Sequence, residues 1–296
     1  MKRTALALLL LLPTAASACD PCGMRADDWR ALKGAGFELA DADARDATAL
    51  ALAGCLGHPD PGIRDGLAYE GLAHWLRAGA LSPEARSRLA DVLLAPGPRG
   101  PVQREEFRAP FVALVLAEVV RSDRVSPWIG PAGRDLMVDR AAGYLAGVRD
   151  YRGFVDGEGW RHGVAHGADW VMQLVLNPAV DEAQVRQLLD AVAAQVAPAG
   201  APPYVHGEPE RLARPVLFAL QRGALDEAGW QAWLDRVADP APLPAWSQAY
   251  GSEADLARRH NLRVFLLALY AGLAESGDET LRARLPPVVA ALRAMD

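Results

Sequence analysis

The sequence lacks most of the features from which a function is usually assigned. It has only three cysteines, and it contains no Gly-x-Ser-x-Gly elbow, P-loop, dinucleotide fingerprint or zinc-finger spacing. Serines are few, and none has the setting of a nucleophile. The formal net charge is −6 and no basic cluster interrupts the chain, which argues against nucleic acid as a partner. No motif therefore identifies the chemistry.

Long apolar runs are also absent, except for one at the start of the chain. Lys2 and Arg3 precede an apolar stretch over residues 5–12, and Ala16-Ser17-Ala18 forms a small-residue cleavage site. This pattern predicts a secretory signal peptide over residues 1–18. The run ends at Pro13, well short of the ~20 residues that span a bilayer. We therefore expect an exported, periplasmic protein.

The three cysteines leave two interpretations open. Cys19 follows Ala18 directly, as in a bacterial lipobox, although Ala16 stands where leucine is usual. If Cys19 carries a lipid, the protein is a membrane-anchored lipoprotein, and Cys22 and Cys55 can pair in the oxidising compartment. If it does not, Cys19 and Cys22 can close a small loop and leave Cys55 in an apolar helix. The lipid on Cys19 would be the only contact with a membrane.

Strand signals are missing as well, and the chain reads as all-α. Alanine and leucine dominate, and no alternating pattern bounded by hairpin turns appears. We expect a tail with a short helix over residues 19–44, followed by one helical domain over 45–296. Ser82 and Asp181 are predicted N-caps, and Pro110 should kink or divide its helix. The predicted helices are 45–56, 63–78, 83–95, 102–122, 131–148, 160–176, 181–197, 208–223, 226–237, 253–276 and 279–294.

Taken in pairs, these helices recur at roughly 40 residues, the spacing of HEAT and armadillo arrays. The segment LGHPDPGIRDGLAYEGLAHWL, Leu56 to Leu76, is typical of a HEAT unit because a Pro-Asp-Pro turn separates two helices. The sequence thus predicts an armadillo/HEAT-like α-α superhelix. An irregular bundle or an α/α toroid is the alternative.

One predicted helix carries a stripe of polar residues within GWRHGVAHGADW, Gly159 to Trp170. At ~100° per residue, His162, His166, Asp169 and Gln173 fall on one face. The opposite, apolar face carries Val164, Ala168, Val171 and Val175. Gly163 and Gly167 lie to one side, where they would let another helix approach closely. The simplest interpretation of the stripe is the solvent-exposed polar face of an amphipathic helix.

The functional interpretation of the stripe is a metal site. Two histidines four residues apart on a helix can both bind zinc, and Asp169 can complete three ligands with an open fourth position. Upstream, Arg152 lies in a glycine-rich loop, where it could hold an anion or pair with Asp150, and Trp160 could wall the pocket.

A second polar segment, Tyr204 to Pro215, follows about forty residues later. Within it, Glu208 and Glu210 are candidates for acid, base or metal partners, and Arg211 could hold substrate charge. As plain acids at a helix start they need no function.

Several segments together resemble the bacterial family of unknown function DUF2785. The most specific are DYRGFVDGEGWRHGVAHGAD and EPERLARPVL, supported by FRAPFVALVLAEVV and NLRVFLLALYAGL. The likeness extends over about residues 45–275. Arg108-Ala109-Pro110-Phe111 departs from the Arg-Ser-Phe that is usual in the family. The resemblance implies an all-helical, armadillo-like fold, and it brings neither an activity nor assigned catalytic residues.

Two functions fit these observations. The first is an exported helical solenoid that binds a peptide, a glycan or a small anionic ligand in a polar groove. The groove would be formed by His162, His166 and Asp169 together with Glu208 and Glu210. The second is a zinc-dependent hydrolase in which Glu208 or Glu210 activates a metal-bound water. Both require the two imidazoles to converge at the floor of a groove.

Overall fold

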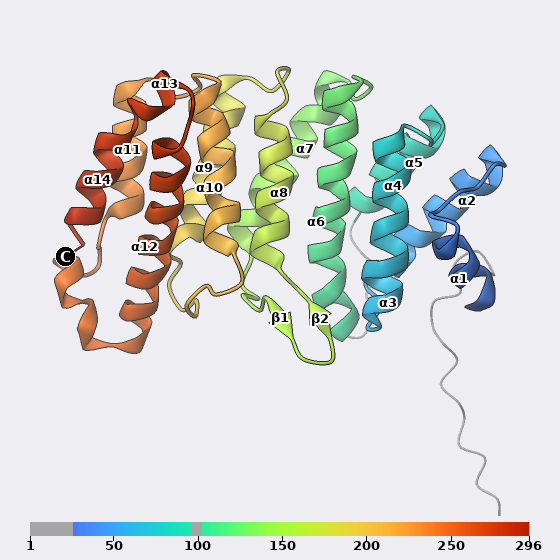
Figure 1. Cartoon of the computed structure of the whole chain (residues 1–296), viewed down its shortest axis with the longest axis horizontal. Helices are drawn as coiled ribbons and strands as arrows, with labels where there is room; N and C mark the ends of the chain where they lie inside the picture. Colours follow the sequence, from blue (N-terminus) through green and yellow to red (C-terminus); the bar gives the residue numbers. More distant parts are fainter. Residues whose placement is uncertain (1–25, 96–101, 296) are drawn as a thin grey trace, which may run out of the picture.

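The computed structural model describes residues 26–95 and 102–295, and it is an array of packed helices (Figure 1). The predicted signal peptide, Cys19 and Cys22 lie outside the described residues. The elements in the first half are α1 (Ala26–Gly34), α2 (Ala42–Leu52), η2 (Ala53–Cys55), α3 (Pro61–Ile63), η3 (Arg64–Tyr69), α4 (Glu70–Ala78), α5 (Pro83–Leu94), α6 (Val102–Val125) and α7 (Pro131–Gly147).

The second half begins with a short hairpin and returns to helices. Its elements are β1 (Phe154–Val155), β2 (Gly159–Trp160), α8 (Gly163–Val175), α9 (Glu182–Val196), α10 (Glu208–Gln221), α11 (Glu227–Ala238), η4 (Trp246–Gly251), α12 (Glu253–Ala274), α13 (Glu279–Arg282) and α14 (Leu285–Arg293). The prediction of an all-α protein is confirmed.

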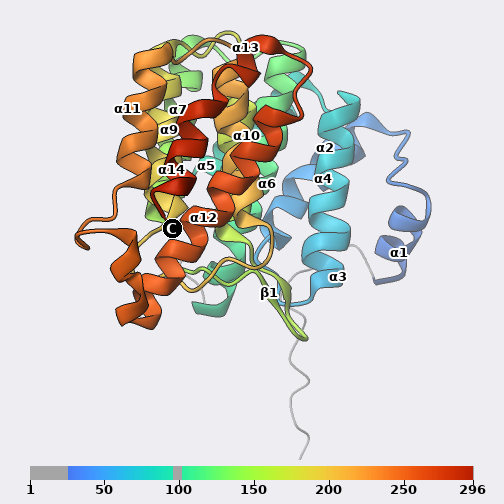
Figure 2. The ribbon, with the colours of Figure 1, turned by 60° about the vertical axis from the view of Figure 1, so that its left-hand side comes forward.

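The helices stand in two layers. Helices α4, α6, α8, α10 and α12 form one row, in which each packs against the next, and α5, α7, α9 and α11 lie behind it (Figures 1 and 2). Helix α7 packs against α8 in the front row and against α9 in its own layer. The contact between the consecutive helices α7 and α8 therefore joins the two layers. Burying an apolar stripe on each helix against the other layer is the main stabilisation of such an array.

Local signals in the sequence set several helix boundaries as predicted. The Ser82 side chain accepts a hydrogen bond from the backbone N–H of Ala85 at 3.1 Å, with Pro83 at the first helical position. Asp181 and Gln184 form a reciprocal capping box at the start of α9. Each such cap satisfies backbone donors that a helix start leaves unpaired.

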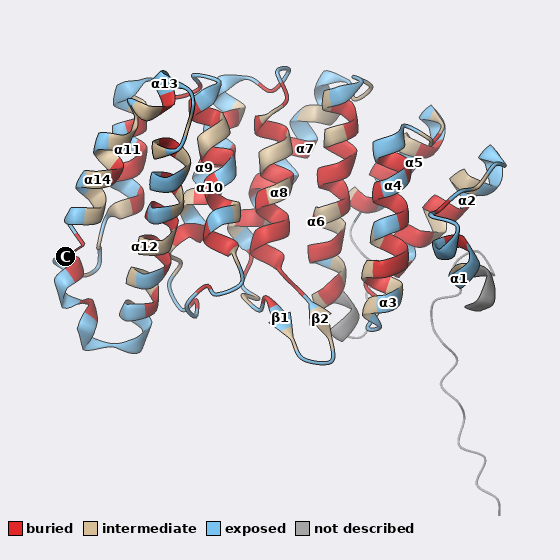
Figure 3. Ribbon diagram, in the orientation of Figure 1, coloured by how far each residue is buried: buried red, intermediate tan, exposed pale blue. Residues whose placement is uncertain are grey.

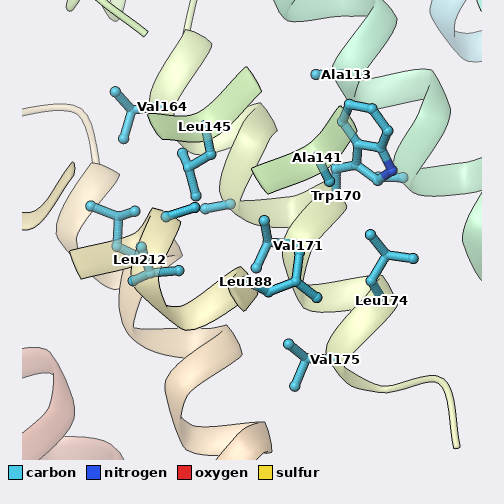
Figure 4. Close-up of a cluster of buried hydrophobic side chains, with 14 of the residues drawn as sticks. Ala113, Ala141, Leu145, Val164, Trp170, Val171, Leu174, Val175, Leu188 and Leu212 are labelled. Atoms are coloured by element: carbon cyan, nitrogen blue, oxygen red, sulfur yellow. The ribbon is translucent and has the colours of Figure 1, made fainter. Parts of the chain in front are cut away.

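Helix α8 lies at the centre of the core. Most of its residues are buried (Figure 3), and Val164, Ala168, Val171 and Val175 are all fully or almost fully inaccessible, as the apolar stripe predicted. They meet side chains of α7, α9 and α10, including Leu145, Leu188 and Leu212 (Figure 4). This packing fixes the rotation of α8 and therefore the direction of its polar side chains.

The predicted role of the α8 glycines is also confirmed. A Cβ atom on Gly167 would lie 2.9 Å from Cε1 of Tyr144, and one on Gly163 would lie 3.4 Å from Cγ1 of Val148. Both contacts come from α7 and its C-terminal end. Glycine costs a helix interior about 1 kcal/mol, and the close approach of α7 offsets that cost.

Some local features differ from the predictions. Of the two effects predicted for Pro110, division of the helix is wrong, because α6 runs without a break through it. The helix expected from residue 160 begins only at Gly163, because Phe154 and Val155 pair with Trp160 and Gly159 in an antiparallel hairpin. His162 is therefore the N-cap of α8 and not a residue of its helical face. Gly157 and Gly159 have φ of 79° and 84°, and such positive angles favour a turn over a helix.

The predicted helix 63–78 is also not uniform. Residues Arg64–Tyr69 form a turn of π-helix before α4, and this widened turn brings the buried Arg64 toward the hairpin loop. In the part of the chain that the structure describes, no helix has the length and apolar character needed to cross a membrane.

Candidate functional site

A polar groove of ≈ 760 Å³ opens on the row formed by α4, α6, α8 and α10. It is lined by three histidines, His162, His166 and His206, and by Trp160 and Phe111. The charged side chains in its wall are Asp65, Glu70, Arg77, Glu118, Arg121, Asp169, Arg211 and Arg214. The volume lies within the range of about 300–1,000 Å³ that is usual for small-molecule sites.

His162 is the N-cap residue of α8 and has an unusual backbone conformation. Its φ of 53° and ψ of 36° are left-handed, a region that non-glycine residues occupy rarely and at a cost. The residue is only 8% exposed, and Nε2 of its ring donates a hydrogen bond to the backbone carbonyl of His206 at 2.9 Å. Burial lowers the pKa of His162, and Glu208, whose Oε1 lies 3.8 Å from Nε2, opposes that shift.

His166 lies one helical turn further along α8 and is more deeply enclosed. Its Nδ1 donates to the carbonyl oxygen of Pro110 at 3.2 Å, and its ring meets Phe111 edge to face with 5.3 Å between centroids. The rings of His162 and His166 are 5.6 Å apart. Burial, and then the neighbouring His162, lower the pKa of His166 to about 3. The side chain is therefore neutral at physiological pH.

An aromatic cluster closes one end of the groove. Trp160 stacks on His162 with 4.4 Å between ring centroids and an interplanar angle of 25°. Phe154 packs edge to face on Trp160, and the ring of His206 lies against Gly153, where a Cβ atom would be 2.3 Å from Nδ1. Trp160 remains 39% exposed and Phe154 45% exposed. The hairpin thus presents an aromatic edge beside the histidines.

Asp169 lines the groove with the two histidines, but among the described residues the three are not arranged as a set of metal ligands. Its carboxylate forms an ion pair with Nη1 of Arg211 on α10. Burial raises the pKa of Asp169, while Arg211 and Arg214 act in the opposite direction. The contact joins α8 to α10 within the wall of the groove.

The acidic side chains in the groove wall differ from the basic ones in how many have a partner of opposite charge. All four carboxylates in its wall have a basic partner: Asp65 with Arg64 at 2.7 Å, Glu70 with Lys33 at 3.1 Å, Glu118 with Nε of Arg77 at 2.9 Å, and Asp169 with Arg211. Two guanidiniums are left over, Arg121 on α6 and Arg214 on α10. Neither forms a hydrogen bond or ion pair with any side chain in the described residues.

Arg152 lies outside this groove and serves the hairpin. It binds Asp150 at 2.6 Å and Glu106 at 3.1 Å, so of its two predicted roles the structure supports pairing with Asp150. The buried Arg161 also binds Glu106, at 2.7 Å. These bonds tie the hairpin to the start of α6, which positions the aromatic edge.

The two predicted glutamates occupy different environments. Glu208 is 2% exposed and accepts a hydrogen bond from the backbone N–H of His206 at 2.9 Å, so it lies behind the histidines. Glu210 is exposed and does not line the groove. Across residues 26–95 and 102–295, no group of three or more His, Cys, Asp and Glu side chains is arranged to hold a metal ion.

Several residues of the groove were not anticipated, namely Tyr69, Arg77, Phe111, Glu118, Arg121 and Arg214. Glu118 and Arg121 carried a signal, because they interrupt the otherwise apolar run FVALVLAEVV and its continuation. Tyr69 and Phe111 carried none, since an aromatic residue at helical spacing is usual in a core.

Comparison with known proteins gives a family without an assigned activity. The family described as "Protein of unknown function (DUF2785)" matches residues 102–271, which include α6 to most of α12 and the groove residues on α6, α8 and α10, but not those on η3 and α4. The chain therefore belongs to DUF2785. No curated protein and no solved structure matches it.

Proposed function

We propose that this protein binds a small anionic ligand in the polar groove. The observation that carries the proposal is a pair of guanidiniums, Arg121 and Arg214, which form no hydrogen bond or ion pair with a side chain of the described residues, in a groove whose carboxylates are all paired. A guanidinium binds carboxylate and phosphate through charge-assisted hydrogen bonds. An anion between α6 and α10 would complete the charge pairing of the wall.

The remaining features of the proposal come from the sequence. The segment 1–18 supports export to the periplasm, with a lipid on Cys19 or simple cleavage as the two routes. Helix pairs at a regular spacing support an armadillo/HEAT-like superhelix, a fold that commonly offers one extended surface for ligands. An exported binding protein accords with the lack of any catalytic motif.

Binding of inorganic phosphate and of suberate, an eight-carbon dicarboxylate, tests the proposal. At a ligand concentration ten times the Kd, unfolding should become about 1.4 kcal/mol less favourable, and the Tm should rise by about 3–5 °C. Sodium chloride at equal ionic strength separates specific binding from screening. No rise with either anion beyond the chloride control would refute the proposal.

Two variants locate the effect. The double variant Arg121→Gln/Arg214→Gln should lose the rise in Tm, because it removes both unpartnered charges. Arg88→Gln is the matched control, since Arg88 is an exposed arginine on α5, away from the groove. An equal response of the double variant and the control would place the anion elsewhere.

The zinc hydrolase remains a second proposal because of one observation. Both histidines donate their N–H to backbone carbonyls, as metal-binding histidines generally do. Residues His162 and His166 would hold the ion, with Asp169 released from Arg211. Stoichiometric zinc in the purified protein, lost in His166→Gln, would support it over the binding proposal.

A further inference from the structure

The hydrogen bonds of the two groove histidines fix which ring nitrogens can accept. A backbone carbonyl only accepts, so His162 carries its proton on Nε2 and His166 carries its proton on Nδ1. Their other nitrogens, Nδ1 of His162 and Nε2 of His166, are acceptors and make no hydrogen bond to the described residues. An organic ligand that pairs with these nitrogens must therefore donate hydrogen bonds.

The ligand group that donates hydrogen bonds to the two histidines should be neutral. The guanidiniums of Arg64 and Arg211 both act electrostatically on His166 and would repel an ammonium group. Glu208, the acid beside His162, is 2% exposed and lies behind the rings. It accepts the backbone N–H of His206 and does not line the groove, so it is not placed to pair with an ammonium group there. Hydroxyl and amide groups are the neutral donors that fit, and the aromatic surface beside the histidines favours hydroxyls carried on a ring.

The aromatic edge adds a surface for the apolar part of such a ligand. Trp160 lines the groove next to the histidines and keeps 39% of its surface exposed. Its contacts with His162 and Phe154 hold the indole in place. A rigid aromatic surface beside hydrogen-bonding groups suits a molecule with both C–H and O–H faces, such as a sugar ring.

Arg121 lies well beyond the histidines along α6. Phe111 contacts His166, and Arg121 follows Phe111 by ten residues on the same helix, a rise of about 15 Å. The side chain of Arg121 can reach back over part of this distance. A ligand that reaches from the histidines to Arg121 must still be longer than a monosaccharide.

We propose that the ligand is a short acidic glycan of two or more sugar units. Its hydroxyl groups lie at His162, His166 and Trp160, and its carboxylate lies at Arg121 and Arg214. This inference rests on the anion-binding function proposed above, and it adds the hydroxyl groups and the length.

Calorimetric titration of the intact protein with four probes tests the inference. Digalacturonate carries hydroxyls and carboxylates at the required length. Cellobiose has the hydroxyls without charge, suberate has the charge and length without hydroxyls, and galacturonate has both at one sugar unit. Digalacturonate should bind at least tenfold more tightly than each of the other three. Glucosamine, which presents an ammonium group, should bind no better than cellobiose.

Two variants separate the contributions of the two ends. Trp160→Leu should weaken digalacturonate and cellobiose at least fivefold and leave suberate unchanged. The double variant Arg121→Gln/Arg214→Gln should weaken digalacturonate and suberate and leave cellobiose unchanged. Circular dichroism at the assay temperature confirms that each variant is folded.

The outcomes distinguish this inference from the function on which it rests. Suberate binding as tightly as digalacturonate would overturn the glycan and leave the anion site standing, and equal binding of galacturonate would overturn the length. Failure of digalacturonate, suberate and inorganic phosphate alike would overturn both proposals.

Discussion

Nε2 of His162 donates a hydrogen bond at 2.9 Å to the backbone carbonyl of His206, 44 positions further along the chain. The bond connects the start of α8 to the loop that leads into α10. His162 makes this bond from a left-handed backbone conformation, with φ of 53°. The groove therefore includes a backbone conformation that non-glycine residues rarely adopt.

The left-handed conformation of His162 predicts an order of stability for two variants. His162→Ala and His162→Gly both remove the imidazole, but only alanine keeps a Cβ atom at φ 53°. The alanine variant should therefore be less stable than the glycine variant by about 1 kcal/mol, although glycine loses more entropy on folding. Urea unfolding measures the difference. Equal stabilities, or a more stable alanine variant, would contradict the argument from strain.

Burial of His166 predicts that the protein is less stable in acid. Its pKa is about 3 in the folded chain, against 6.5 for an unperturbed histidine, so the unfolded chain takes up the proton first as the pH falls. The neutral, buried His166 contributes fully to the free energy of unfolding above pH 6.5, and this contribution is lost progressively toward pH 3. By pH 5 the loss should reach about 2 kcal/mol.

The variant His166→Asn isolates this contribution, because the asparagine amide takes the place of Nδ1 and can still donate to the carbonyl of Pro110, but it does not titrate in this range. Urea unfolding at pH 7.5 and pH 5 should show a fall that is about 2 kcal/mol smaller in the variant than in the parent chain. The same fall in both proteins would assign the acid sensitivity to other groups.

The close packing of α7 on α8 predicts opposite effects for two Gly→Ala substitutions. Alanine at Gly167 would place its Cβ 2.9 Å from Tyr144 and 3.1 Å from Leu145, so it should destabilise the protein by about 1–3 kcal/mol. Gly143 lies within α7, and a Cβ atom added there would meet no atom within 4 Å. Alanine there should stabilise by about 0.5–1 kcal/mol. Thermal unfolding should separate the two variants in Tm, and a stabilising Gly167→Ala would contradict the packing.

The burial of Arg64 predicts that its substitution strongly reduces the stability of the protein. Its guanidinium is inaccessible, binds Asp65 at 2.7 Å and the carbonyl of Glu158 at 2.9 Å, and lies 4.2 Å from the centre of the Phe107 ring. Arg64→Met should destabilise the protein by about 3–5 kcal/mol, because it removes one partner from a buried network. Denaturant unfolding measures the loss.

A surface arginine provides the control for Arg64. Arg186 pairs with Glu182 at 3.1 Å, with 56% and 66% of the two side chains exposed, so Arg186→Met should change stability by less than about 0.5 kcal/mol. Similar losses in the two variants would mean that Arg64 acts as an ordinary surface charge.

Much of the helical architecture follows from the sequence because its causes are local. Caps at Ser82 and Asp181 and the apolar stripe of α8 depend on residues within a turn or two of one another. The hairpin was missed for a different reason. Gly157 and Gly159 permit a turn but do not require one, and the bonds of Arg152 and Arg161 to Glu106 on α6 hold it there.

The sequence alone determined that the chain is helical, which stripe of α8 is buried, and that its glycines admit a neighbouring helix, because periodicity and the missing Cβ act within one element. It also indicated that His162 and His166 belong together. Only the tertiary structure decided that Asp169 pairs with Arg211, that Glu210 lies outside the groove, and that Arg121 and Arg214 form no ion pair within the part of the chain that the structure describes. Charge pairing depends on distances between helices, and those distances are set by how the layers pack.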